Sequence, residues 1–254
     1  MTWNLGRARL GGDELARAED LPHIMNVIER EKPDVVALQE LASGKQLEML
    51  ARRLRGAYRG RASGRRARTV LLVRRRHTIT ETFELRTRNG RRAPALEFKR
   101  ARIAEPITIV GVHADPFDAR ARRMFIEDLV AQTRPRKGLV FLIGDFNLDV
   151  AGDGRRGGDR ASLTDRLAHD AESYSLLARH FVDAGKSAGA TALLERRLDY
   201  VFARPRTVAP VRARTLDAAV GEMDHRALVV LTDLRAKPRM QLLPEARSTG
   251  TLER

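Results

Sequence analysis

The sequence predicts an α/β protein with a polar site at the carboxyl ends of its strands. Short apolar runs typical of buried strands recur along the chain, and segments with a helical spacing of apolar residues lie between several of them. The clearest run, at residues 139–143, has five consecutive apolar residues and is followed by a glycine. Asp145, Asn147 and Asp149 then alternate, so in an extended segment their side chains leave the backbone on one side. They indicate either a site at a sheet edge or a turn that merely ends a strand.

Length and composition limit the classes of protein that this chain can form. With 254 residues it can bury a sizeable core, as one large α/β domain or two small ones. The lack of cysteine excludes disulfides, thiolate metal sites and thiol catalysis. No apolar stretch approaches the roughly 20 residues that cross a bilayer, and the first residues do not resemble a secretory leader. We therefore expect a soluble, cytoplasmic protein with no membrane span.

The chain is strongly basic. It has 48 Lys and Arg against 33 Asp and Glu, a formal net charge of +15. Such a surface attracts polyanions, so nucleic acid or a phosphorylated substrate is favoured. The segment at residues 58–68 is the best candidate contact, and a mobile, solvated loop is the alternative. Its arginines are Arg59, Arg61, Arg65, Arg66 and Arg68.

Several predicted strands of the N-terminal half end in polar residues. The expected strands lie at residues 1–5, 34–40, 69–73, 78–85, 93–101 and 107–112, and the expected helices lie at residues 15–30 and 44–54. Asn4, Glu40 and His113 lie at or just after the ends of three of these strands. The pair Asn89-Gly90 predicts a hairpin turn.

The C-terminal half adds further polar residues beside predicted strands. A helix is expected at residues 118–132, with Met124, Phe125, Leu129 and Val130 on its core face, and a charged, glycine-rich loop is expected at residues 151–161. Local helical spacing is expected at residues 163–179, and strands are expected at residues 197–203, 208–215 and 227–231. Asp199 faces inward from one of these strands and needs a partner, while Asp224 and His225 immediately precede the last strand. A poorly ordered polar tail is expected from residue 235.

These polar residues form one chemically consistent set. Taken singly, each could be a turn residue or a satisfied core partner. Taken together, they provide oxygen donors and two histidines without sulfur, a combination that suits Mg²⁺ better than Zn²⁺. Histidines beside carboxylates also suit proton transfer.

Six short motifs, taken in order, resemble the endonuclease/exonuclease/phosphatase superfamily. They are TWN (2–4), LQE (38–40), GVH (111–113), GDFN (144–147), RLDYVF (197–202) and DH (224–225). The resemblance covers about residues 1–232 and is specific because GDFN and DH occur together in this order. It implies a four-layer α-β-β-α sandwich of two mixed β-sheets, with the site at one end of the sheets. We accordingly expect one such domain at residues 1–234 and a disordered tail at residues 235–254.

The resemblance also implies roles for individual residues. Glu40, assisted by Asn4 and with Asp224 as a further ligand, would hold Mg²⁺, for which Mn²⁺ could substitute. Asp145 would orient or deprotonate the attacking water, and Asn147 would hold a phosphate oxygen.

The histidines would complete this implied site. His225, supported by Asp199, would bind or protonate the phosphate oxygens, and His113 would be the second histidine, as in the pancreatic deoxyribonuclease branch. That branch orients the second histidine with a glutamate, yet residues 58–76 contain no acidic residue, which leaves Asp115 or Glu81 to serve. The position that typically holds an aspartate in the abasic-site repair branch is glycine here, at residue 6, which argues against abasic specificity.

Three functional hypotheses follow from the sequence. The preferred one is a Mg²⁺-dependent phosphodiesterase, an endonuclease that acts on DNA through its basic surface. The second is a phosphatase or phospholipase-type enzyme acting on a small or lipid phosphate. The third is a nucleic-acid-binding protein that has lost turnover.

Overall fold

The computed structural model describes residues 1–6, 20–41, 50, 52–54, 56–62, 69–150, 160–204, 209–219 and 223–234. The predicted tail at residues 235–254, most of the helix predicted at residues 44–54 and most of the loop predicted at residues 151–161 lie outside the described residues. Arg65, Arg66 and Arg68 also lie outside them.

Two β-sheets make up the centre of the molecule. The first contains β1 (Thr2–Asn4), β2 (Val35–Gln39), β3 (Tyr58–Ala62), β4 (Thr69–Arg74), β11 (Ala209–Leu216) and β12 (Ala227–Asp233). The second contains β5 (Thr78–Arg86), β6 (Arg92–Lys99), β7 (Ile107–His113), β8 (Leu139–Asp145), β9 (Val182–Asp183) and β10 (Asp199–Arg204). Their strand orders are β11-β12-β1-β2-β4-β3 and β5-β6-β7-β8-β10-β9. Both are mixed, because β1 pairs with β2 and β7 with β8 in parallel, whereas neighbours such as β10 and β8 pair antiparallel.

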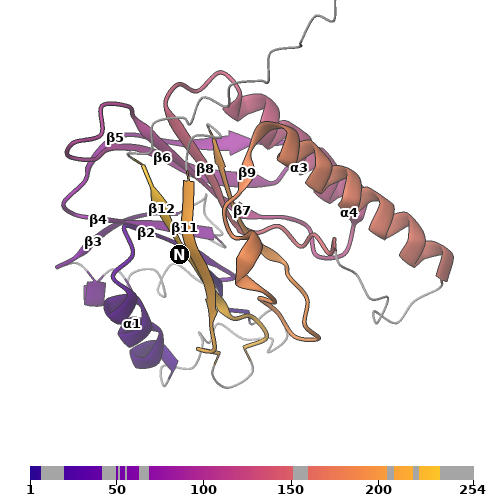
Figure 1. Cartoon of the computed structure of the whole chain (residues 1–254), viewed down its shortest axis with the longest axis horizontal. Helices are drawn as coiled ribbons and strands as arrows, with labels where there is room; N and C mark the ends of the chain where they lie inside the picture. Colours follow the sequence, from indigo (N-terminus) through magenta and orange to yellow (C-terminus); the bar gives the residue numbers. More distant parts are fainter. Residues whose placement is uncertain are drawn as a thin grey trace, which may run out of the picture.

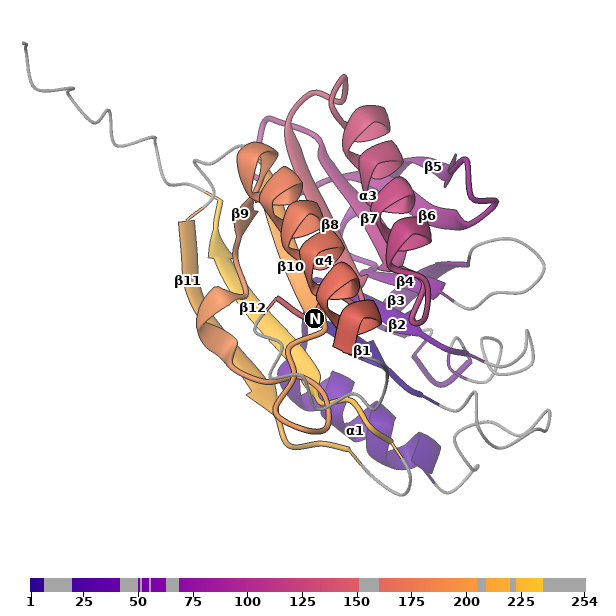
Figure 2. The same cartoon turned by 90° about the vertical axis from the view of Figure 1, so that its right-hand side faces the viewer.

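Helices cover the outer faces of the two sheets. α1 (Asp20–Glu31) lies on one side, and α3 (Ala119–Thr133) and α4 (Arg160–His180) lie on the other, with the sheets between them (Figure 1). A 90° turn of the molecule shows α3 and α4 side by side (Figure 2). The predicted α/β class and the four-layer sandwich implied by the resemblance are therefore confirmed.

Three apolar clusters correspond to the three interfaces between the four layers. The first packs α1 residues such as Ile24 and Ile28 against Trp3 of β1. The second packs Phe125 and other residues of α3 and α4 against the second sheet. The third lies between the sheets and contains, among others, Leu71, Val73, Ile109 and Phe141. Burial of these clusters is the main force holding the layers together.

A buried ion pair joins α3 to α4 and to two loops at one end of the second sheet. Arg122 on α3 and Asp170 on α4 have side-chain exposures of 0% and 1% and lie 2.6 Å apart at closest approach. Arg122 Nη1 also donates to the backbone oxygen of Asp115, after β7, at 2.8 Å. Asp170 Oδ2 accepts from the backbone N–H of Asp149, after β8, at 3.2 Å. The pair thus fixes both loops to the helical layer.

Two local predictions differ from the structure. Residues 58–62, predicted to begin a loop, form the edge strand β3, which pairs antiparallel with β4 through its backbone and therefore needs no apolar periodicity. Met124, predicted on the core face of its helix, is 37% exposed, while Phe125, Leu129 and Val130 are buried as predicted. The predicted hairpin is confirmed, since β5 and β6 pair antiparallel from Thr78↔Lys99 to Arg86↔Arg92.

Candidate active site

One end of the two sheets brings together residues from five strand ends. Asn4 is the last residue of β1, Glu40 follows β2, and His113 and Asp145 are the last residues of β7 and β8. Asp145 pairs in register with His113 on one side and with Asp199, the first residue of β10, on the other. The carboxyl ends of the parallel strands and the amino end of an antiparallel neighbour therefore meet at one place.

Asp145 lies at the centre of this cluster and is 1% exposed. Its Oδ2 accepts from Asn4 Nδ2 at 2.9 Å, a hydrogen bond that crosses from the first sheet to the second. Oδ2 also accepts from Asn147 Nδ2 at 3.1 Å, and Oδ1 accepts from the backbone N–H of Asn147 at 2.8 Å. These bonds hold the carboxylate in one orientation. Asn147 Nδ2 additionally lies 3.3 Å from the backbone oxygen of Ala114, in the loop after His113.

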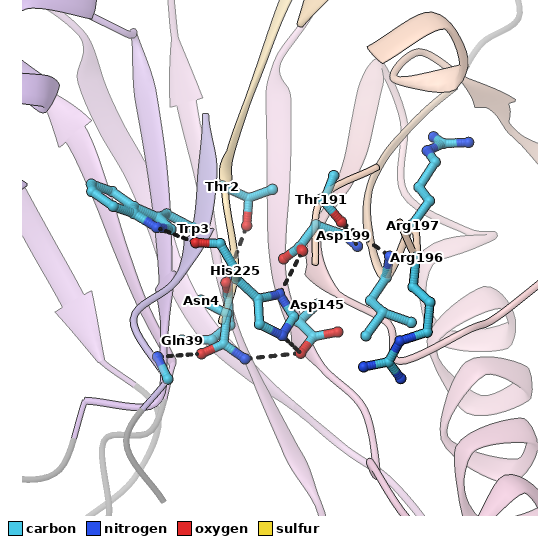
Figure 3. A network of polar contacts seen from close by, with 12 residues as sticks. Thr2, Trp3, Asn4, Gln39, Asp145, Thr191, Arg196, Arg197, Asp199 and His225 are labelled. Carbon is cyan, nitrogen blue, oxygen red and sulfur yellow. Dashed lines mark hydrogen bonds and ion pairs between the residues drawn. The ribbon is translucent and has the colours of Figure 1, made fainter. Parts of the chain in front are cut away.

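His225 lies between two aspartates. Its Nδ1 is 2.8 Å from Asp199 Oδ2, and its Nε2 is 3.9 Å from Asp145 Oδ2 (Figure 3). The backbone is held as well, because Trp3 Nε1 donates to the backbone oxygen of His225 at 3.2 Å. The ring is thus fixed at Nδ1, while the other nitrogen faces Asp145 beyond hydrogen-bond distance.

The carboxylates around His225 determine its charge. Burial alone would lower the pKa of this imidazole, but Asp199, Asp145 and Asp224 raise it to about 10, with Asp199 the strongest of the three. His225 is therefore an imidazolium at neutral pH. A charged ring with its Nδ1 hydrogen-bonded to Asp199 can donate from Nε2 to an anion.

Glu40 and His113 form a second contact at the edge of the cluster. Glu40 Oε1 accepts from Asn4 Nδ2 at 3.1 Å and lies 3.5 Å from His113 Nε2, which is buried without a hydrogen-bond partner. Neither carboxylate considered from the sequence serves this histidine. Asp115 binds Arg91 and two backbone N–H groups of its own loop, and Glu81 pairs with Arg136.

Asp224 lies beside the end of β1. A Cβ atom at position 6 would be 2.6 Å from Asp224 Oδ1, so glycine at that position leaves room for this carboxylate. Asp224 is exposed, unlike Asn4 and Asp145. It therefore forms the solvent-facing side of the cluster.

The backbone is strained at two of these positions. Glu40 and Asn147 have φ angles of +59° and +51°, in the left-handed region that residues other than glycine rarely adopt. Such conformations concentrate at functional sites, where packing holds them in place. Glycine is required sterically at position 144, because a Cβ there would lie 1.9 Å from the backbone oxygen of Val112 on β7. Only glycine allows β7 and β8 to deliver His113 and Asp145 side by side.

The oxygen donors fit a hard divalent cation whose coordination is completed from outside the protein. Within the described ranges, no three His, Asp or Glu side chains come close enough together to enclose a metal ion unaided. Glu40 Oε1 and Asp145 Oδ2 nevertheless lie within 3.1 Å of the same Asn4 amide nitrogen. Mg²⁺ is commonly held by one or two carboxylates together with water and phosphate oxygens. The donor set suits Mg²⁺ in that way.

Thr191 belongs to the site but was not predicted from the sequence. Its Oγ1 accepts from the backbone N–H groups of Leu198 and Asp199, both at 3.0 Å, and its backbone oxygen accepts from Arg226 N at 2.7 Å. It thereby joins the segment before β10 to the segment that carries His225. A threonine in a loop gives no sequence signal for this role.

The fold and the site together place the chain among the phosphoesterases. It belongs to the Endonuclease/Exonuclease/phosphatase family, whose sequence profile matches residues 1–222. Enzymes of this family typically use divalent metal ions. No curated protein sequence matches this one.

Solved structures with low sequence identity share the fold. An endonuclease/exonuclease/phosphatase from Bacteroides vulgatus has a TM-score of 0.69 and 18% identity, with 91% of this chain and 97% of that chain covered. A mannosyl-6-phosphatase from Bacteroides thetaiotaomicron has a TM-score of 0.65 and 18% identity, with coverages of 91% and 98%. TDP2 from D. rerio, complexed with a single strand DNA product, has a TM-score of 0.65 and 14% identity, with coverages of 89% and 92%. In the described part of this chain, no helix is long and apolar enough to span a membrane.

Proposed function

We propose that this chain is a Mg²⁺-dependent phosphodiesterase, an endonuclease that cleaves DNA by in-line attack of water. The observation that carries the proposal is the position of Asp145. It lies between the fixed imidazolium of His225 and the Asn4 amide that also binds Glu40. One phosphorus centre could therefore be reached by Asp145 as the base, by His225 as the cationic donor and by Glu40 as the metal-binding carboxylate.

The protein's own groups would carry out proton transfer and charge stabilisation. Asp145 Oδ2 takes a proton from the attacking water as the new O–P bond forms, and the opposite P–O ester bond breaks, its oxygen taking a proton from solvent. His225 Nε2 donates to a phosphate oxygen, and Asn147 Nδ2 does the same in place of its long bond to Ala114. Mg²⁺ held at Glu40 and Asn4 would supply further positive charge to the phosphate oxygens.

Charge and strand geometry favour a nucleic acid as the substrate. The net charge is +15. Arg59 is exposed on β3, and the segment that carries Arg65, Arg66 and Arg68 is flanked by Ala62 and Thr69. Thr69 pairs in register with Gln39, the residue before Glu40. The described residues that flank the arginine-rich segment therefore lie at the end of the first sheet where the site is, and the net charge together with the exposed Arg59 would attract a polyanionic strand.

Plasmid and oligonucleotide cleavage tests this function. We expect purified protein to nick supercoiled plasmid and cut single-stranded and duplex oligonucleotides with Mg²⁺, to do so with Mn²⁺ as a substitute, and to stop when EDTA is added. Asp145→Ala, purified in the same way, is the control for contaminating nucleases. Intact DNA under every condition with the parent protein would refute the proposal.

A small or lipid phosphate is the second candidate substrate. The mannosyl-6-phosphatase, whose fold this chain shares at 18% identity, is the reason to consider such a substrate. The likeness between the two proteins is one of fold. A panel of sugar phosphates, inositol phosphates and sphingomyelin under the same conditions distinguishes the two enzymes. Tight DNA binding without any hydrolysis would instead favour a binding protein that has lost turnover.

A further inference from the structure

Phe117 stands apart from the other aromatic residues of the chain. Its side chain is 86% exposed, whereas every other Phe, Tyr and Trp is buried or half-buried. It lies in the loop between β7 and α3, four residues after His113. Single exposed apolar residues are common on proteins, so exposure alone assigns no role.

The loop that carries Phe117 is held rigidly. Asp115 Oδ1 accepts from the backbone N–H groups of Phe117 and Asp118, both at 2.9 Å, and Asp115 Oδ2 accepts from Arg91 at 2.6 Å. The buried Arg122 donates to the backbone oxygen of Asp115 at 2.8 Å. Asp118 then caps α3 by accepting from two N–H groups of the first helical turn. Phe117 is therefore presented to solvent from a fixed backbone, so little conformational entropy would be lost on binding a ligand.

The same loop is in contact with the catalytic cluster. Ala114 N donates to the backbone oxygen of Asp145 at 3.0 Å, and Ala114 O lies 3.3 Å from Asn147 Nδ2. Three residues span at most about 11 Å, so Phe117 lies within that distance of Ala114. A base next to a phosphate bound at Asn147 can reach it. Arg120, the second residue of α3, is also exposed, and its guanidinium lies 3.9 Å from the carboxylate of Asp165.

Building on the nuclease function proposed above, we propose that Phe117 is a stacking platform for the base beside the scissile phosphate. Stacking on a protruding side chain requires a free base face, which a paired base inside a duplex does not offer. The preferred substrate is therefore single-stranded or locally unpaired DNA. Phe117 is a specificity-determining residue here, because it contacts the base and takes no part in the reaction at phosphorus.

The test compares substrates with and without bases. The full chain and its Phe117→Ala, Phe117→Leu and Phe117→Tyr variants are assayed with Mg²⁺ on a single-stranded DNA oligomer, on its duplex, and on an oligomer of equal length built from base-free spacers. Leu231→Ala is the matched control, since Leu231 is 59% exposed and lies six residues beyond His225 along β12, about 20 Å away. Melting temperatures are measured for every protein.

The stacking role predicts a pattern that a scaffold role does not. Phe117→Ala should lower kcat/KM on the single strand by roughly 5- to 150-fold, the range that loss of one stacked base produces. Phe117→Tyr, which keeps an aromatic ring, should have the kcat/KM of the parent protein on the single strand, whereas Phe117→Leu should show the same loss as Phe117→Ala. All the proteins should have equal kcat/KM on the base-free oligomer. Equal losses on both oligomers, no loss on either, or a parent protein that prefers the duplex would overturn the inference.

A binding measurement separates failure of this inference from failure of the nuclease function. Fluorescence anisotropy gives the Kd of the single strand for Asp145→Ala with and without Phe117→Ala. If the parent protein hydrolyses only phosphomonoesters, the nuclease proposal fails. The stacking role is then supported if adding Phe117→Ala weakens binding to the DNA strand but not to the base-free oligomer. It is refuted if Phe117→Ala weakens binding to neither oligomer or to both.

Discussion

The charge of His225 can be tested by removing the carboxylate that sustains it. Asp199 is fully buried and is the largest of the influences that raise the pKa of His225 from 6.5 to about 10. Asp199→Asn removes this charge but keeps an oxygen that can accept from Nδ1. An opposite charge at this distance typically shifts a pKa by about 1–3 units, so we expect the pKa of His225 to fall by that amount.

The expected changes in activity and stability follow from the sign of the shift. His225 acts as a cation, so hydrolysis should hold steady well above neutral pH in the parent protein and decline from a pH about 1–3 units lower in Asp199→Asn. A raised histidine pKa stabilises the fold fully below the unfolded value of 6.5, and this stabilisation disappears as the pH rises through about 10. The variant should therefore lose about 1–4 kcal/mol of unfolding free energy just below pH 6.5, where Asp199 is charged, and progressively less towards alkaline pH. Burial raises the pKa of Asp199 as well, so the loss should also shrink at strongly acidic pH, where this carboxyl is neutral in the parent protein.

NMR of ¹⁵N-labelled imidazoles measures the titration directly and without turnover, and urea unfolding at several pH values measures the stability. Asp183→Asn is the matched control, because Asp183 is a largely buried aspartate of the second sheet that pairs with Arg197. It should lower stability while leaving the His225 titration unchanged. An unaltered His225 titration in Asp199→Asn would refute the assignment of its charge to this pair.

Three further substitutions separate catalysis, metal binding and architecture. Asp145→Ala should lower kcat by about 10²–10⁴-fold while leaving the Kd for DNA within a few-fold in anisotropy, and preserved activity would mean that another group activates the water. Glu40→Ala should raise the Mg²⁺ concentration for half-maximal activity by about tenfold or more, and an unchanged Mg²⁺ titration would remove Glu40 from the metal site. Arg122→Ala leaves Asp170 buried without its charged partner and should lower the free energy of unfolding by about 3–5 kcal/mol. The melting temperature should fall by about 10 °C, and a fall of less than about 2 °C would contradict this role of the ion pair.

The sequence was most informative where local patterns decide the structure. The apolar run at residues 139–143 predicts a buried strand that stops at the following glycine, and the structure has that strand, which continues through Gly144 to Asp145. Edge strand β3 escaped prediction because its place depends on backbone pairing with β4 rather than on apolar spacing. Met124 was misplaced because α3 has apolar residues on more than one face, and only its packing selects the buried one.

Long-range pairings around the site were harder to foresee. Asp199 was expected to need a partner and, by resemblance, to support His225, and the two side chains meet at 2.8 Å. The neighbour of His113 was expected to be Asp115 or Glu81, yet the structure places Glu40, which follows a strand of the other sheet, at 3.5 Å. Such contacts depend on how the sheets stack, which strand patterns do not specify.

The hydrogen bond from Asn4 to Asp145 crosses the gap between the sheets, with consequences for how folding relates to activity. A chain in which only one sheet has formed has half of the cluster, so it cannot hydrolyse anything by this route. Recovery of turnover during refolding would consequently lag behind recovery of β-sheet circular dichroism, and it would report the docking of the two halves. Mutations that loosen that docking far from the site would lower the fraction of active molecules without altering the reaction performed by those that remain.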